Sequence, residues 1–209
     1  MKFVVFFALF VAAAAKYGFD VAYDFPQESW NCLHNQNGMS FAVVRCYMST
    51  GEVDPNCASS VQKAWNSGLE RVDLYMFPCP TCGNAAGQVN ALYNYISSNG
   101  VKFNQLWLDI EGPEYWMGQG DNRNFYEELS ATTNKLFPTR WGVYTNKNGW
   151  ESIFGAWTPS LSCPLWHAYW DNTPSLSGFT PFDGFNSRAM KQYHGGTTLC
   201  SMSVDLDAY

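Results

Sequence analysis

Short β-rich runs alternate with amphipathic segments along the chain from Tyr17 onward. This alternation is typical of βα units, in which helices connect parallel strands and cover the sheet that the strands form. The first five predicted strands cover residues 18–22, 41–47, 71–77, 105–110 and 141–145, and helical patterns cover residues 59–66, 85–98, 122–136 and 150–154. The sequence therefore predicts an α/β fold.

The pattern changes after residue 154. Three further β-rich runs, 165–170, 189–194 and 202–206, are separated by loops rich in Pro, Ser and Gly. Eight strands with about five helices predict a modified TIM-like barrel, in which about five βα units are followed by three β-strands. A doubly wound open sheet is the alternative that periodicity leaves open. The 209 residues suit one domain, which we place at residues 16–209.

The first residues predict export. Lys2 precedes the apolar run Phe3–Phe10, and the small residues Val11–Ala15 offer a cleavage site before Lys16. We therefore predict a signal peptide at residues 1–15, because the apolar stretch is too short to span a bilayer. The mature protein is expected to be secreted and extracellular, with a lysosome-like or gut compartment as alternatives, and to have no membrane association.

An exported protein meets an oxidising environment, so its seven cysteines are candidates for structural disulfides. The odd number leaves at least one thiol outside any pair within the chain, and the connectivity stays open. No second Cys pair with metal-ligand spacing accompanies Cys79 and Cys82, and His34, His167 and His194 lack the spacing of a metal cluster. We therefore expect no metal and no cofactor.

The charge of the chain argues against nucleic acid as a partner. The formal net charge is −6, and the nine Trp and twelve Tyr are scattered instead of being interleaved with Lys or Arg. Such aromatic residues suit either a protein core or stacking on sugars.

Two carboxylates follow the apolar part of the fourth predicted strand. Asp109 and Glu111 are two residues apart, so on a strand they share one face, at the end where βα barrels build their sites. The apolar neighbours Trp107, Leu108 and Ile110 favour a raised carboxyl pKa. Such a pair can supply the acid and the second negative group that glycosidic bond cleavage needs. A solvated strand end is the alternative.

Further motifs stand in order along the chain. They are Gly18-Phe19-Asp20-Val21, Phe41-Ala42-Val43-Val44-Arg45, Trp107 to Glu111, Gly142-Val143-Tyr144-Thr145 with Trp150, Leu165-Trp166-His167-Ala168, Gln192-Tyr193, and Val204-Asp205-Leu206-Asp207. With these motifs, the sequence from Tyr17 to Tyr209 resembles glycoside hydrolase family 25, the Chalaropsis-type lysozymes, and in particular the invertebrate and protist branch of this family.

The resemblance implies a barrel of five βα units and three plain strands. It also implies an N-acetylmuramidase that cuts bacterial peptidoglycan between N-acetylmuramic acid and N-acetylglucosamine. Glu111 would be the general acid, and Asp109 would stabilise positive charge by orienting the substrate's own acetamido group as internal nucleophile. Asp20 and Asp205 would set the electrostatics around this pair. The resemblance places Tyr75, Tyr144 and Trp166 as candidates for holding the sugar.

Three departures from the family pattern concern substrate preference more than chemistry. The third strand reads Leu74-Tyr75-Met76-Phe77-Pro78-Cys79 and lacks a His found in many members, Asp207 replaces the usual Asn, and residues 114–122 form an insertion. Other acids stand beside turn residues or polar neighbours and are expected to be solvated or to form turns: Asp24, Asp54, Asp73, Asp121, Asp171 and Asp183.

Two other functions stay open. One is a catalytically inactive wall-binding or signalling protein, and the other is a hydrolase of the same family that acts on chitin-like polymers. We expect a monomer. The biological role, antibacterial defence or digestion, and the retaining or inverting outcome are not determined by the sequence.

Overall fold

The computed structural model describes residues 15–209. The predicted signal peptide lies outside this range except for Ala15. The strands are β1 Tyr17–Val21, β2 Phe41–Met48, β3 Glu52–Val53, β4 Arg71–Met76, β5 Leu106–Asp109, β6 Trp141–Thr145, β7 Leu165–Ala168, β8 Met190–Leu199 and β9 Met202–Ala208. The α-helices are α1 Gln27–Asn37, α2 Cys57–Asn66, α3 Ala85–Ser98, α4 Gln119–Leu136 and α5 Lys147–Phe154, with short 3₁₀ helices at Pro80–Cys82 and Pro113–Tyr115.

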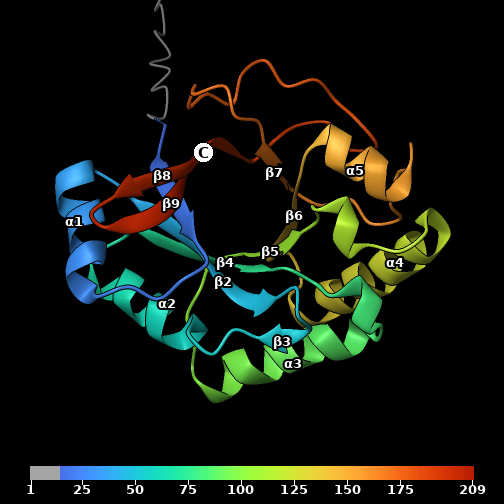
Figure 1. The fold of residues 1–209 in the computed structure, drawn as a ribbon, viewed down its shortest axis with the longest axis horizontal. Helices are drawn as coiled ribbons and strands as arrows, with labels where there is room; N and C mark the ends of the chain where they lie inside the picture. Colours follow the sequence, from blue (N-terminus) through green and yellow to red (C-terminus); the bar gives the residue numbers. More distant parts are fainter. Residues whose placement is uncertain (1–14) are drawn as a thin grey trace, which may run out of the picture.

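Eight strands close into a barrel (Figure 1). The order around it is β1, β2, β4, β5, β6, β7, β8 and β9, and neighbours from β1 to β8 are parallel. Strand β9 pairs antiparallel with both β8 and β1, which completes the ring, and the short β3 adds only to the edge of β2. The predicted barrel of five βα units and three strands is confirmed, and the open sheet is excluded.

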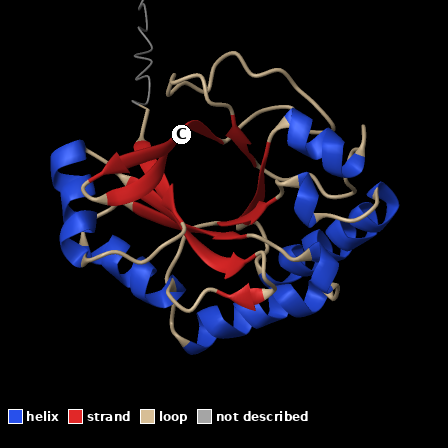
Figure 2. Cartoon of the chain, viewed as in Figure 1, coloured by secondary structure: helices blue, strands red, loops and turns tan. Residues whose placement is uncertain are grey.

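The helices pack on the outside of the ring of strands (Figure 2). The sequence predicted no helix between the first two strands, yet α1 lies there. Only Trp30 and Leu33 of its eleven residues are buried, so α1 lacks the continuous apolar stripe that identifies an amphipathic helix. Helix α4 also begins three residues before its predicted start, within the insertion at residues 114–122.

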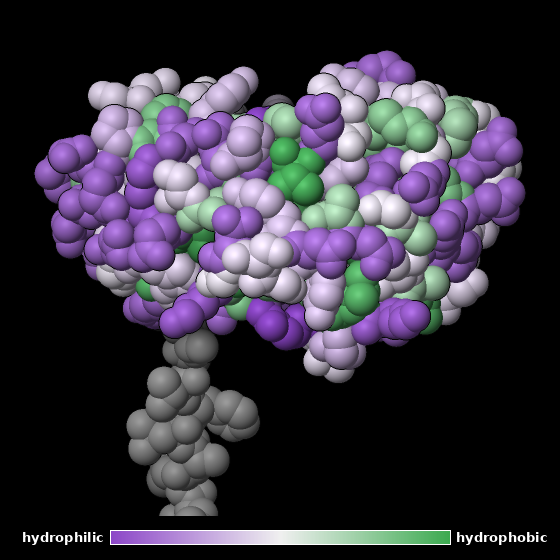
Figure 3. Space-filling model, turned by 90° about the horizontal axis from the view of Figure 1, so that it is seen from below, coloured by the Kyte–Doolittle hydropathy of each residue, from purple (hydrophilic) through white to green (hydrophobic). Residues whose placement is uncertain are grey.

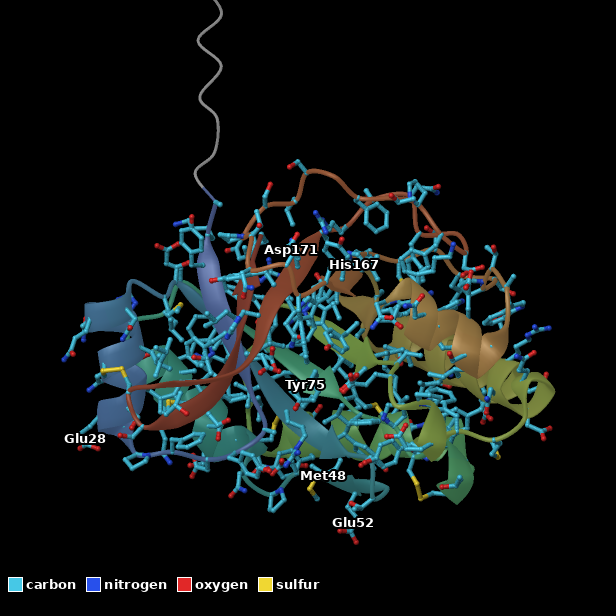
Figure 4. The ribbon with its side chains drawn as sticks, turned by 45° about the horizontal axis from the view of Figure 1, so that its top comes forward. Glu28, Met48, Glu52, Tyr75, His167 and Asp171 are labelled. Atoms are coloured by element: carbon cyan, nitrogen blue, oxygen red, sulfur yellow. A yellow bond between two sulfur atoms is a disulfide. The ribbon has the colours of Figure 1, made fainter. Side chains whose placement is uncertain are left out.

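The barrel interior is filled by large side chains. Alternate strand residues point inward, and the interior cluster contains Phe41, Val43, Tyr75, Trp107, Tyr144, Trp166 and Met190. Tyr75 lies in the centre of the ring of strands in Figure 4. These side chains fill the channel, and βα barrels build their active sites above such a filled interior, at the carboxyl ends of the parallel strands.

Disulfides link Cys32 with Cys200, Cys46 with Cys57, and Cys79 with Cys82, and Cys163 is the free thiol. This confirms the expectation of structural disulfides and provides the connectivity that the sequence left open.

Of the acids expected to be solvated or to form turns, Asp73 does neither, and Asp54 is buried but forms a turn in which its Oδ1 accepts from Asn56 N–H at 2.9 Å. Asp54 is 2% exposed and Asp73 is fully buried. Each is paired with a cation, Asp54 with Arg45 at 2.8 Å and Asp73 with Arg71 at 2.7 Å. Asp73 also accepts a hydrogen bond from Trp107 Nε1 at 2.9 Å. Buried carboxylates need such partners. Arg71 lies two residues before Asp73 on the same face of β4, whereas the indole of Trp107 comes from the neighbouring strand β5.

Within residues 15–209, no cluster of three or more His, Cys, Asp or Glu side chains is arranged to hold a metal ion. No helix in the same range is long and apolar enough to cross a membrane. On the face shown in Figure 3, hydrophobic residues are separated by hydrophilic ones, so that face has no continuous apolar patch.

Candidate active site

The two carboxylates after β5 face the mouth of the barrel. Asp109 is the last residue of β5 and is 4% exposed, and Glu111 is half-buried two residues later. Ile110, between them, points the other way into the outer core. Gly112 has a φ of 61° and turns the chain away from the site. Asp109 and Glu111 therefore lie on one side of the strand, as predicted.

Asp20 and Asp205 reach the same mouth from the strands that close the barrel. They are register partners in the antiparallel pair of β1 and β9. Together with Asp109 and Glu111 they line one pocket of about 160 Å³. The structure thus brings all four predicted acids together, although they come from three strands far apart in the sequence.

Gln192 of β8 orients two of the acids. Its Nε2 donates to Asp20 Oδ2 at 2.7 Å and to Asp205 Oδ2 at 3.3 Å. Its Oε1 accepts from the Tyr144 hydroxyl at 2.8 Å and from Trp170 Nε1 at 2.7 Å. The sequence pattern did not identify Gln192 as a site residue. A buried amide at the carboxyl end of a barrel strand is the signal that could have identified it.

Burial and mutual repulsion raise the pKa values of three acids in the pocket, Asp109, Glu111 and Asp20. Burial is the largest cause for Asp109, and the negative charges of Glu111 and Asp20 raise its pKa further, well above the ordinary value. Arg45, which lies 2.8 Å from Asp54, acts in the opposite direction on Asp109. One oxygen of Asp109, Oδ1, is buried without a hydrogen-bond partner.

Glu111 and Asp20 also have raised pKa values. Burial is the main cause for Glu111, followed by the charges of Asp205 and Glu114. Burial and the charge of Asp205 raise the pKa of Asp20 to about 8. A carboxylic acid in this setting keeps its proton towards neutral pH, which a general acid requires.

The three predicted sugar-holding residues, Tyr75, Tyr144 and Trp166, all line the pocket. They are 8%, 6% and 2% exposed, so they form its floor and wall. Three other aromatic residues at the mouth have exposed rings, and the sequence motifs did not indicate them. Tyr23 and Trp170 are each 64% exposed, and Tyr169 is 54% exposed. Exposed rings beside a polar cleft suit stacking on sugars.

A second pocket of about 540 Å³ continues from the first. Glu111 and Tyr144 line both pockets, so Glu111 lies where the two meet. The second pocket extends past Trp170 to Lys147 and Arg188. The acids therefore lie within a longer groove that can accept a chain of sugars on both sides of Glu111.

Known proteins resemble this chain in both sequence and fold. The family model described as Lysozyme-like protein 1 matches residues 11–193. Probable GH family 25 lysozyme 2 of Dictyostelium discoideum is 43% identical over 213 residues, which cover 100% of each chain. Lysozyme-like protein 5 of Caenorhabditis elegans is 33% identical over 201 residues, covering 94% of this chain and 93% of that protein.

Among solved structures, a family GH25 lysozyme from Aspergillus fumigatus superposes with a TM-score of 0.74 at 16% identity, covering 94% of each chain. At this identity the likeness concerns the fold. The family match, the relatives and the paired carboxylates at the mouth of a closed barrel lead to one conclusion: the chain belongs to the glycoside hydrolase family 25 lysozymes and is a glycoside hydrolase.

Proposed function

We propose that this protein is a secreted N-acetylmuramidase, which hydrolyses the β-1,4 bond between N-acetylmuramic acid and N-acetylglucosamine in bacterial peptidoglycan. The observation that carries this proposal is the position of Glu111 beside the buried Asp109, at the point where two pockets form one groove. The lysozyme names of the relatives support peptidoglycan as the substrate.

Glu111 is the proton donor in the proposed reaction. Its raised pKa lets it arrive protonated and transfer the proton to the glycosidic oxygen as the bond from that oxygen to the sugar C1 breaks. The acetamido oxygen of the substrate then bonds to C1. In the second step the Glu111 carboxylate takes a proton from water, and the water oxygen attacks C1 and releases the acetamido group.

Asp109 stabilises the positive charge that develops on the sugar ring. Burial raises the pKa of its carboxyl in the free protein, and a nearby cationic sugar lowers this pKa again, so that Asp109 releases its proton to water in the open pocket and becomes ionised. This interaction is therefore stronger in the transition state than in the ground state, as catalysis requires. Asp109 also accepts the acetamido N–H and so orients the internal nucleophile.

The test is digestion of labelled peptidoglycan by the mature protein, with identification of the new reducing ends. New N-acetylmuramic acid ends are expected from the wild type. Glu111→Gln should lower turnover by roughly 10²-fold or more, the usual contribution of a positioned general acid, and Asp109→Asn should act similarly. Glu52→Gln removes an exposed carboxylate on β3, outside both pockets, and serves as the matched control.

Near wild-type turnover in a folded Glu111→Gln variant would remove Glu111 from its assigned role. Binding of peptidoglycan without cleavage by the wild type would instead support the inactive wall-binding protein. Cleavage of chitin oligosaccharides in preference to peptidoglycan would support the chitin-like substrate.

Secretion and a role in antibacterial defence or digestion are parts of the same proposal. Three disulfides support an oxidising destination. We also propose that the protein acts as a monomer, which sedimentation of the purified protein tests.

A further inference from the structure

Asp207 is a buried acid that the proposed mechanism does not use. It lies on β9, two residues after Asp205, and faces Gly18 of β1. Its side chain is fully buried within the barrel. Trp166 Nε1 donates to its Oδ1 at 2.8 Å, and Trp166 is itself part of the interior cluster.

The second oxygen of Asp207 has no donor. Oδ2 is buried without a hydrogen-bond partner, and the strand register places Asp207 diagonally next to Asp20, because Asp207 pairs with Gly18 and Asp20 pairs with Asp205. Two ionised carboxylates are both acceptors, so they cannot bond to each other. A single proton shared by the two carboxyls removes the repulsion and gives Oδ2 of Asp207 a hydrogen-bond partner.

The surroundings of the two acids decide which one holds this proton. Asp20 is half-buried, lines the open pocket and accepts a hydrogen bond from Gln192 at 2.7 Å. Asp207 is fully buried and has only the indole donor. When the pair has lost one of its two protons, the negative charge is therefore better stabilised on Asp20, and the remaining proton on Asp207.

We propose that Asp207 is a positioning residue, which stays protonated in the active protein and donates a hydrogen bond to Asp20. The titratable groups around it are Asp20 from β1, Asp205 from β9, Tyr144 from β6 and Tyr193 from β8. None of these four groups is a cation, so none of them offsets a negative charge on Asp207. The bound proton keeps the carboxyl neutral instead. Burial, and then the charge of Asp20, raise the pKa of Asp207 well above its ordinary value.

The proposal predicts an upper pH limit for the site. Loss of the Asp207 proton would place two adjacent negative charges in the barrel, next to the pocket that contains Glu111. An Asn at this position would donate an N–H to Asp20 at every pH. Asp207 therefore makes the geometry of Asp20 depend on pH, whereas Asn would not.

The first experiment measures kcat/KM on peptidoglycan against pH, and so rests on the proposed function. Because Glu111 also loses its proton on the alkaline side, ionisation of Asp207 should steepen the fall of the wild-type profile at high pH, and Asp207→Asn should reduce the slope of that limb by one proton, with little change at the acidic side. Asp183→Asn is the control, because Asp183 also has a pKa raised by burial but lies in the loop between β7 and β8, outside the first pocket. Its profile should match the wild type.

A profile of Asp207→Asn that superposes on the wild type would overturn the proposal. An equal loss of activity at every pH in a folded variant would also overturn it, because a purely structural role lowers activity without changing the slope of the alkaline limb.

A second measurement needs neither activity nor a variant that folds well. In wild-type protein containing aspartate labelled with ¹³C at the side-chain carboxyl, the Asp207 signal should keep the shift of a protonated carboxyl above neutral pH. Ionisation of Asp207 below about pH 5, near the ordinary range of aspartate, would overturn the proposal. If the signal titrates as expected while peptidoglycan is not cleaved, the proposed function fails and the proton assignment stands.

Discussion

Water reaches Glu111 and Asp109 to different extents. Glu111 is half-buried where the two pockets meet, so it can exchange its proton with solvent and touch the leaving oxygen. Asp109 is 4% exposed and has one oxygen without a partner. A buried group of this kind responds strongly to a nearby positive charge, because little water screens the interaction. The two carboxyls therefore suit two different roles.

Gly142 also matters at the residue scale, because it makes room inside the barrel. A Cβ built at Gly142 would lie 2.5 Å from Trp107 Cζ3 and 2.7 Å from the backbone oxygen of Pro164. We predict that Gly142→Ala lowers the free energy of unfolding by about 1–3 kcal/mol, the usual cost of overpacking. Urea denaturation measures this change.

Gly120→Ala is the matched control for Gly142→Ala. Gly120 lies in α4, and a Cβ there has no atom within 4 Å. This variant should be neutral or slightly more stable, because alanine favours a helix over glycine. Equal destabilisation by both substitutions would contradict the packing argument.

At the scale of elements, the hairpin of β8 and β9 determines how the barrel closes. Leu199 pairs with Met202, and the two turn residues Cys200 and Ser201 have φ values of 51° and 63°. Positive φ at both positions is typical of a type I′ turn, for which Asn-Gly is the usual sequence. Cys-Ser carries no such signal, which explains why the strand predicted at residues 189–194 stopped short of this turn, while the strand predicted at 202–206 begins where β9 begins.

The Cys32–Cys200 disulfide ties α1 to this turn across a sequence separation of 168 residues. We predict that Cys32→Ser with Cys200→Ser lowers the free energy of unfolding by about 2–4 kcal/mol, because a long loop is no longer closed in the unfolded chain. Cys79→Ser with Cys82→Ser opens a loop with a separation of only 3 residues and should cost less. Urea midpoints of both double variants, compared at equal m-values, test the order; the reverse order would contradict it.

At the scale of the whole molecule, three acids at the mouth, Asp20, Asp109 and Glu111, make stability depend on pH. Their pKa values are raised in the folded state, so the folded protein binds protons more tightly than the unfolded chain. Such groups destabilise the fold increasingly as the pH rises from their unfolded pKa, near about 4, to their folded pKa. For Asp20 the folded pKa is about 8.

His167 acts in the opposite direction over a different range. Burial, and then Arg188 and Lys191, lower its pKa to about 4, so its effect is complete above its unfolded pKa of about 6.5. Between about pH 6.5 and 8, His167 no longer changes the stability, whereas the acids with raised pKa values still do. We therefore predict that the free energy of unfolding falls as the pH rises through this range. Urea denaturation at several pH values measures the slope, which Asp20→Asn should flatten. A constant or rising free energy across this range would be inconsistent with protonated acids.

The sequence by itself determined the order of the strands, most of the helices and the shared face of Asp109 and Glu111. These features depend on periods of two and 3.6 residues and on short turn signals, which are local. Local patterns did not predict α1, β3 or the full length of the β8–β9 hairpin, because these segments lack a clear periodicity or turn signal.

Only the tertiary structure decided which distant residues meet. Barrel closure places Asp20 beside Asp205 and brings Gln192 between acids from two strands. It also brings Cys32 to Cys200 for the longest-range disulfide. The burial and protonation of each carboxyl follow from these long-range contacts. Local sequence cannot specify them, because the desolvation of a charge depends on every element packed around it.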